Sequence, residues 1–180
     1  MARSISPSER WSILITALVL GVVIGLTNLL APIHEWCHVA VAGREGVGAR
    51  VTSWTTAEVD SPNFKSQVTS GWFGEMVVFG VFGLIGVAVG RRWPLFTGGF
   101  PLGHMLSTWG RGYGSYDFST GLRSYLDSFS HLSDGVRESA YMAARDSLMT
   151  VWTILCIVLV GALAGLVIYW LKKPRKAGAK

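Results

Sequence analysis

Residues 11–31 read WSILITALVLGVVIGLTNLLA, an apolar run without a single charged side chain. About 20 apolar residues are what an α-helix needs to cross the hydrocarbon core of a bilayer. The run is longer than the apolar core of a signal peptide, and it leads into Pro-Ile-His-Glu rather than a small-residue cleavage site. We therefore expect a retained transmembrane helix here.

The composition of the whole chain also favours a membrane protein. Half of the 180 residues are hydrophobic, 15% are charged, and the mean hydropathy is +0.40. That is more apolar than an ordinary soluble domain of this length. The net charge of +5 comes partly from the terminal LKKPRKAGAK, which directly follows an apolar span as membrane-flanking clusters do. We expect one polytopic domain over residues 1–180, in contact with lipid and without a nucleic-acid partner.

Three further segments are long enough, or nearly so, to cross a membrane: residues 72–90, 93–109 and 148–171. The sequence thus predicts an all-α membrane protein with about four transmembrane helices. The span over 93–109 contains three glycines and Pro101, which predict a poor continuous helix. Irregular backbone at membrane depth must be buried in protein or line a wet cavity, so this span should face the interior of the bundle.

Two segments, 44–70 and 110–147, are expected outside the membrane. The first has β-branched residues and turn signals, which predict a small hairpin near the membrane surface. Within the second, residues 119–147 have apolar side chains at irregular helical spacing. They predict one or two short interfacial helices, with Ser133 or Asp134 as the N-cap of the second.

The basic residues predict the orientation. With a cytoplasmic N-terminus, the only acid on the inner side is Glu9, and the basic residues there are Arg3, Arg10, Arg91, Arg92, Lys172, Lys173, Arg175, Lys176 and Lys180. The positive-inside rule therefore places both termini in the cytoplasm.

The first apolar run ends in a cluster of ionisable residues, APIHEWCHVAVAG at 31–43. We expect a helix that resumes at Pro32 and continues to residue 42. His34 and His38 then lie one turn apart on one face, where two imidazoles can bind the same Zn²⁺. Glu35 supplies a general base in this H-E-x-x-H pattern. Ionisable groups at a membrane are costly and mark functional sites; the alternative is a solvated helix end at the interface.

A catalytic zinc needs a third protein ligand, and two residues are candidates. Asp117 follows the span 93–109, after glycines that let the backbone turn back into the bundle; alternatively it caps the next helix. His104 lies within that span, and its alternative role is a buried or outer-shell histidine. We prefer Asp117 and keep His104 as the alternative.

The segment HEWCHVAVAGREGV, residues 34–47, resembles the H-E-x-x-H-x-x-x-A-x-x-x-G segment of the site-2 protease-like intramembrane zinc metalloproteases. Residues 70–86 and 114–122 are similar to two later segments of the compact bacterial branch. The N-P-x-x-D-G segment of the larger members is absent, and FPLGHML at residues 100–106 resembles it only loosely. In familiar members the zinc lies toward the cytoplasm, whereas the charge distribution here places it on the outer side.

The resemblance implies a zinc endopeptidase of the bacterial inner membrane that hydrolyses peptide bonds in membrane-spanning or membrane-edge protein substrates. It implies His34, His38 and Asp117 as zinc ligands and Glu35 as the catalytic base. Two other functions remain open. One is a non-catalytic accessory subunit of a larger membrane complex that retains this fold, and the other is a metal-dependent transporter or sensor, although no inverted repeat is visible.

Overall fold

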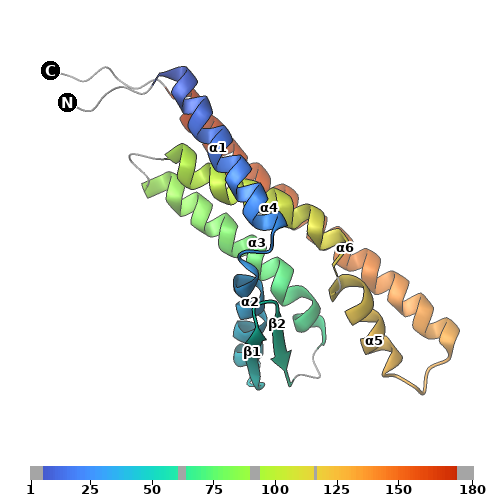
Figure 1. Cartoon of the computed structure of the whole chain (residues 1–180). Helices are drawn as coiled ribbons and strands as arrows, with labels where there is room; N and C mark the ends of the chain where they lie inside the picture. Colours follow the sequence, from blue (N-terminus) through green and yellow to red (C-terminus); the bar gives the residue numbers. More distant parts are fainter. Residues whose placement is uncertain (1–5, 61–63, 90–93, 116, 174–180) are drawn as a thin grey trace.

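The computed structural model describes residues 6–60, 64–89, 94–115 and 117–173 (Figure 1). Its helices are α1 (Pro7–Leu26), α2 (Ala31–Arg44), α3 (Phe64–Val89), α4 (Pro94–Tyr113), the π-helix η1 (Asp117–Gly121), α5 (Leu122–Asp127) and α6 (Asp134–Lys172), and its strands are β1 (Ala49–Ser53) and β2 (Thr56–Val59). The chain is therefore mostly helical with one small sheet, as expected.

Three of the described helical segments are long and apolar enough to cross a membrane: Pro7–Leu26, Ser70–Val89 and Asp134–Lys172. Their outward faces carry exposed large apolar side chains such as Phe82 and Val158, which suits contact with lipid. The fourth expected span corresponds to α4, which is not among these three. The chain is thus membrane-like, with three spanning helices supported by length and composition.

The first helix is interrupted just before the ionisable cluster. α1 ends at Leu26 and α2 begins at Ala31, so the run over 11–31 is not one helix. Asn28 adopts a left-handed conformation with φ +58°, a geometry that asparagine tolerates and that turns the chain. Pro32 lies in the first turn of α2, which confirms the expectation that the helix resumes there.

α4 is an uninterrupted helix with Pro101 inside it, contrary to the expectation of a broken one. Its glycines serve close helix packing instead. A β-carbon on Gly103 would lie 2.1 Å from the carbonyl oxygen of Leu18, and one on Gly21 would lie 2.1 Å from that of Phe100. Each helix has two such glycines four positions apart, Gly21 and Gly25 on α1 and Gly99 and Gly103 on α4. This spacing lets the two backbones touch, as in many membrane helix pairs. Most of α4 is buried, which confirms its interior position.

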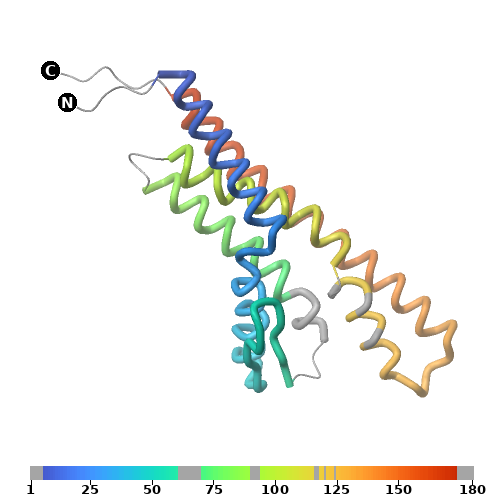
Figure 2. Tube along the Cα trace, in the orientation of Figure 1, coloured from blue at the N-terminus to red at the C-terminus, as the bar shows by residue number. Residues whose placement is uncertain are grey.

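α4 packs against α1, α3 and α6 (Figure 2). Met76 of α3, Met105 of α4 and Trp152 of α6 are fully buried between these helices. The described ends of the chain lie together at one end of the bundle (Figure 1), where Arg10 donates hydrogen bonds to the carbonyls of Leu171 and Lys173 at 3.2 and 2.8 Å. Both ends therefore face the same side.

The prediction that both termini are cytoplasmic depends largely on residues that the structure does not describe. Six of the basic residues used for it lie outside the described residues: Arg3, Arg91, Arg92, Arg175, Lys176 and Lys180.

The expected hairpin is present and packs beside α2. β1 and β2 are antiparallel, with Ala49 opposite Val59.

α5 is the expected short helix, and Ser133 is the N-cap of α6. However, residues 134–147 form no separate second helix, because they continue into the last span as one 39-residue helix. No glycine or proline stands between Val136 and Val160 to end it. At 1.5 Å per residue α6 is about 58 Å long, so it extends well beyond a hydrocarbon core of about 30 Å.

Candidate metal centre

The histidines of the H-E-x-x-H pattern lie on the inner face of α2. The buried residues of this helix are Ala31, His34, Glu35, His38 and Ala42, which recur at helical spacing and face α3. His34, Glu35 and His38 are each 9% exposed. The alternative of two solvated histidines at a helix end therefore does not describe this structure.

The two imidazoles point their Nε2 atoms at each other. Nε2 of His34 lies 3.3 Å from Nε2 of His38. Two nitrogens bound to one tetrahedral zinc at about 2.0–2.1 Å are separated by roughly 3.3 Å. The separation thus suits two ligands of a single metal ion.

The other nitrogen of each ring has its own hydrogen-bond partner on α3. Nδ1 of His34 lies 3.1 Å from Oε2 of Glu75, and Nδ1 of His38 lies 2.8 Å from Oγ of Ser70. When Nδ1–H donates to these oxygens, the lone pair of each ring is on Nε2. Zinc-binding histidines are held in this way by a carboxylate, carbonyl or other oxygen behind the ring.

Gly71 of α3 leaves room beside the two Nε2 atoms. A β-carbon at this position would lie 2.3 Å from Nε2 of His34 and 2.4 Å from Nε2 of His38, and contacts under 3.0 Å do not occur for real β-carbons. Any residue other than glycine would therefore force the imidazoles apart. The donor set and this space fit two of the three protein ligands of a zinc ion.

An aromatic residue and an arginine pack in sequence against His34. Trp72 packs edge-on against His34, with ring centroids 4.6 Å apart, and the guanidinium of Arg111 lies 5.0 Å from the Trp72 ring. Arg111 also donates hydrogen bonds to the Gly25 carbonyl and to Oδ1 of Asn28. α4 thereby holds the turn between α1 and α2, which sets where α2 begins.

His104 lies behind Glu75 rather than beside the two Nε2 atoms. Its Nε2 is 2.7 Å from Oε1 of Glu75, and Thr108 donates to the same oxygen at 3.0 Å. Its Nδ1 is buried and has no hydrogen-bond partner among the described residues, so the ring proton belongs on Nε2. This is the arrangement of an outer-shell group, which was the alternative role considered for His104.

The side chain of Asp117, the preferred third ligand, lies outside the described residues. Its backbone opens η1, which packs against α3, the helix that carries Gly71 and Glu75. Single-turn π-helices often occur at functional sites. Within the described part of the chain, no group of three or more His, Cys, Asp or Glu side chains is arranged to hold a metal.

Cys37, the second variable residue of the H-E-x-x-H pattern, packs against α3. A β-carbon on Gly74 would lie 2.6 Å from its Sγ. Burial, aided by the nearby Glu75 charge, raises the pKa of the thiol to about 11. Cys37 is therefore a neutral thiol that packs α2 against α3.

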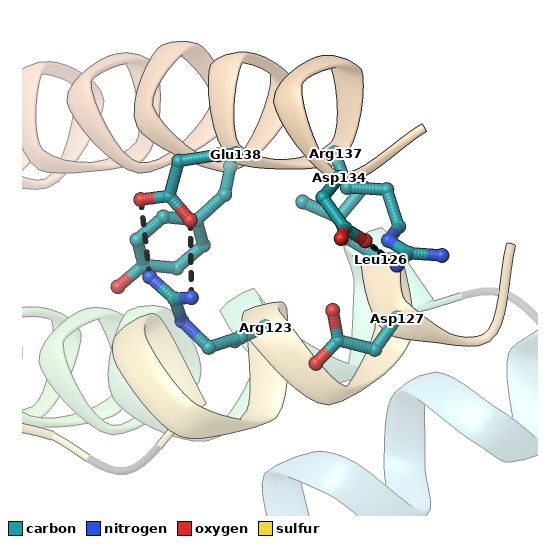
Figure 3. Close-up of a pocket in the computed structure, with 7 residues that line it drawn as sticks. Arg123, Leu126, Asp127, Asp134, Arg137 and Glu138 are labelled. Carbon is teal, nitrogen blue, oxygen red and sulfur yellow. Dashed lines mark hydrogen bonds and ion pairs between the residues drawn. The ribbon is translucent and has the colours of Figure 1, made fainter. Parts of the chain in front are cut away.

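A second polar site, the pocket between α5 and α6, has a volume of about 180 Å³ (Figure 3). Arg123 pairs with Glu138 at 3.0 Å, and Arg137 pairs with Asp134. Arg123, Asp134 and Glu138 are largely exposed and Arg137 is partly buried. Asp127 adds a third carboxylate to the two arginines of the pocket. Exposed pairs of this kind contribute little stability. The Arg123–Glu138 pair joins α5 to α6, whereas Arg137 and Asp134 both belong to α6.

The sequence reasoning missed Glu75, Ser70 and Gly71. A signal for Glu75 was present, since it is the one acid in the apolar run WFGEMVVFG and buried acids in membrane helices are functional candidates. Ser70 and Gly71 carry no such signal, because only the packing of α3 on α2 gives them a role.

Comparisons of the chain with protein-family models, with curated proteins and with solved structures gave no match.

Proposed function

We propose that the protein is a membrane-embedded zinc metallopeptidase. The observation that carries the proposal is the buried pair of Nε2 atoms from His34 and His38, 3.3 Å apart and each backed by an oxygen on Nδ1. The resemblance of residues 34–47 to site-2 protease-like enzymes points the same way. Asp117 is proposed as the third ligand, since His104 is occupied with Glu75.

In this proposal each side chain has a defined task. His34 and His38 hold the ion, which when bound supplies a Lewis acid for the scissile carbonyl and acidifies water. Glu35 accepts the proton of the attacking water and returns it to the departing amine. Burial of Glu35 excludes bulk water and strengthens these electrostatic interactions.

The substrate would be a membrane-spanning or membrane-edge protein segment that has unwound. A helical peptide bond is shielded, so the substrate must present an extended strand. The β1–β2 hairpin packs beside α2 and has outer strand edges to which such a segment could pair by β-strand addition. The proposed location is the bacterial inner membrane, with both termini in the cytoplasm.

The test compares Glu35→Gln with the wild-type protein in detergent micelles. Zinc content is measured by atomic absorption, and hydrolysis is measured with a fluorogenic library of apolar peptides. We expect Glu35→Gln to retain zinc and to lose at least about 100-fold in activity, as for loss of a general base. Glu138→Gln, which makes the same change on distant α6, should cleave normally. Full activity of Glu35→Gln would refute the assignment.

The second candidate is a non-catalytic subunit that has kept the metal-site geometry. It is favoured by the large exposed apolar side chains on the outer faces of α1 and α6, which suit contact with a partner subunit as well as with lipid. One zinc per chain together with no hydrolysis by the wild-type protein would support it over the peptidase. Loss of zinc on Asp117→Asn would instead support a complete three-ligand site.

A further inference from the structure

We infer that Glu75, held in place by His104 and Thr108, is a positioning residue that sets the zinc affinity of His34. This inference rests on the proposed function, because it concerns how tightly the proposed ligand binds. It assigns a role to a buried acid, a buried histidine and a buried threonine that the cleavage steps themselves do not use.

Both oxygens of Glu75 are engaged, and in different directions. Oε2 faces Nδ1 of His34 at 3.1 Å, while Oε1 receives hydrogen bonds from Nε2 of His104 at 2.7 Å and from Oγ1 of Thr108 at 3.0 Å. Glu75 is 3% exposed. A buried carboxylate is costly unless donors surround it, and here three donors converge on it.

The two proposed zinc ligands are backed unequally. Behind His34 stands a carboxylate, whereas behind His38 stands the neutral hydroxyl of Ser70. A negative charge on Nδ1–H increases the electron density on Nε2 and makes the imidazole a stronger ligand. The charge of Glu75 therefore contributes to metal binding beyond simple orientation of the ring.

The position of Glu75 depends in turn on α4. His104 is 1% exposed and Thr108 is fully buried, and both belong to the helix whose glycines lock it against α1. The hydrogen bonds thus connect α4, through α3, to His34 on α2. Loss of the hydrogen bond from His104 or Thr108 to Glu75 should therefore weaken zinc binding, although neither residue faces the Nε2 pair.

The test measures Zn²⁺ affinity by competition with a chromogenic chelator, using the full chain in detergent micelles. Glu75→Gln keeps the size of the side chain and removes its charge, and we expect about 10–100-fold weaker binding. His104→Gln and Thr108→Val should each weaken binding less. Their effects should vanish in the Glu75→Gln background, because they act through Glu75.

Ser107→Ala provides the matched control on α4. Ser107 is buried like Thr108 but donates to the His104 carbonyl and not to Glu75, so its loss should leave zinc affinity unchanged. The visible spectrum of bound Co²⁺ gives a second readout: Glu75→Gln should shift its bands, which a purely structural role would not do. Thermal melting of each metal-free variant reports stability separately.

The outcomes separate this inference from the proposed function. Failure of the wild-type protein to bind Zn²⁺ would overturn both. Zinc binding by the wild-type protein with unchanged affinity in Glu75→Gln would overturn the inference alone. If Glu75→Gln does not fold, unchanged affinity in both His104→Gln and Thr108→Val overturns it instead.

Discussion

Gly71 of α3 lies directly against His34 of α2, so that a β-carbon on the glycine would stand 2.3 Å from the Nε2 atom of the histidine. The same β-carbon would be 2.4 Å from Nε2 of His38. The convergence of the two imidazoles thus depends on the absence of a side chain on a neighbouring helix. This relationship can be tested with a single methyl group.

Gly71→Ala should abolish tight zinc binding while the protein still folds. The atoms nearest the new methyl are the ends of two histidine side chains, which can rotate away, so the geometry of the pair is lost before the fold is. We expect a loss in Zn²⁺ affinity of about 100-fold or more, measured by chelator competition. Gly43→Ala on α2, where a β-carbon meets no atom within 4 Å, should bind zinc normally. Equal affinity of the two variants would contradict the geometry described.

Ser70→Ala should weaken zinc binding by about fivefold, since removing one hydrogen-bond partner costs roughly 1 kcal/mol. The hydroxyl lies 2.8 Å from Nδ1 of His38 and orients that ring. Ser70→Thr keeps the hydroxyl and should bind nearly as well as the wild-type protein. A Ser70→Ala variant that matches Ser70→Thr would show that the hydroxyl does not support the site.

Gly103→Ala should destabilise the bundle by about 1–3 kcal/mol, as overpacking does. Its β-carbon would lie 2.1 Å from the carbonyl oxygen of Leu18, and backbone cannot move aside as a side chain can. Thermal denaturation in micelles measures the effect. At Gly165 on α6 a β-carbon meets nothing within 4 Å, so Gly165→Ala should not lower the midpoint. An unchanged midpoint for Gly103→Ala would argue against close contact of α1 and α4.

Reporter fusions should place both termini in the cytoplasm. A fluorescent protein fused after residue 180 should be bright, and alkaline phosphatase at the same point should be inactive. Alkaline phosphatase inserted after residue 131, in the connection between α5 and α6, should be active, because that end of the bundle lies opposite the termini (Figure 1). The reverse pattern would mean that the distribution of basic residues gives the wrong orientation and that the metal centre faces the cytoplasm.

The helical membrane character, the hairpin and the N-cap at Ser133 could be predicted because each depends on local sequence. Apolar length, turn residues and the residue types that precede a helix act within one segment. The break at Asn28 and the continuity of α4 could not be predicted in this way. The glycines of α4 look like helix breakers along the chain, but their role is to admit the backbone of α1.

The metal centre likewise has features that the local sequence predicts and features that depend on helix packing. His34, Glu35 and His38 are recognisable by spacing, since an i, i+4 pair shares a helix face in any context. Nothing local, however, directs both Nε2 atoms to one point or puts an oxygen behind each ring. Those features come from Ser70, Gly71 and Glu75, more than 30 positions later in the chain.

By itself, then, the sequence determined an apolar helical chain and a helix that carries His34, Glu35 and His38 within about one turn. Only the tertiary structure decided that these side chains are buried, that the histidines converge, and that His104 backs Glu75 instead of joining the pair. The physical reason is that periodicity sets which face of a helix a residue occupies, whereas the partner on that face is set by helix packing. Here close approach at Gly21 and Gly103 joins α1 to α4, and Gly71 lets α3 approach the histidines of α2. The Glu75 carboxylate of α3 then receives hydrogen bonds from both α2 and α4.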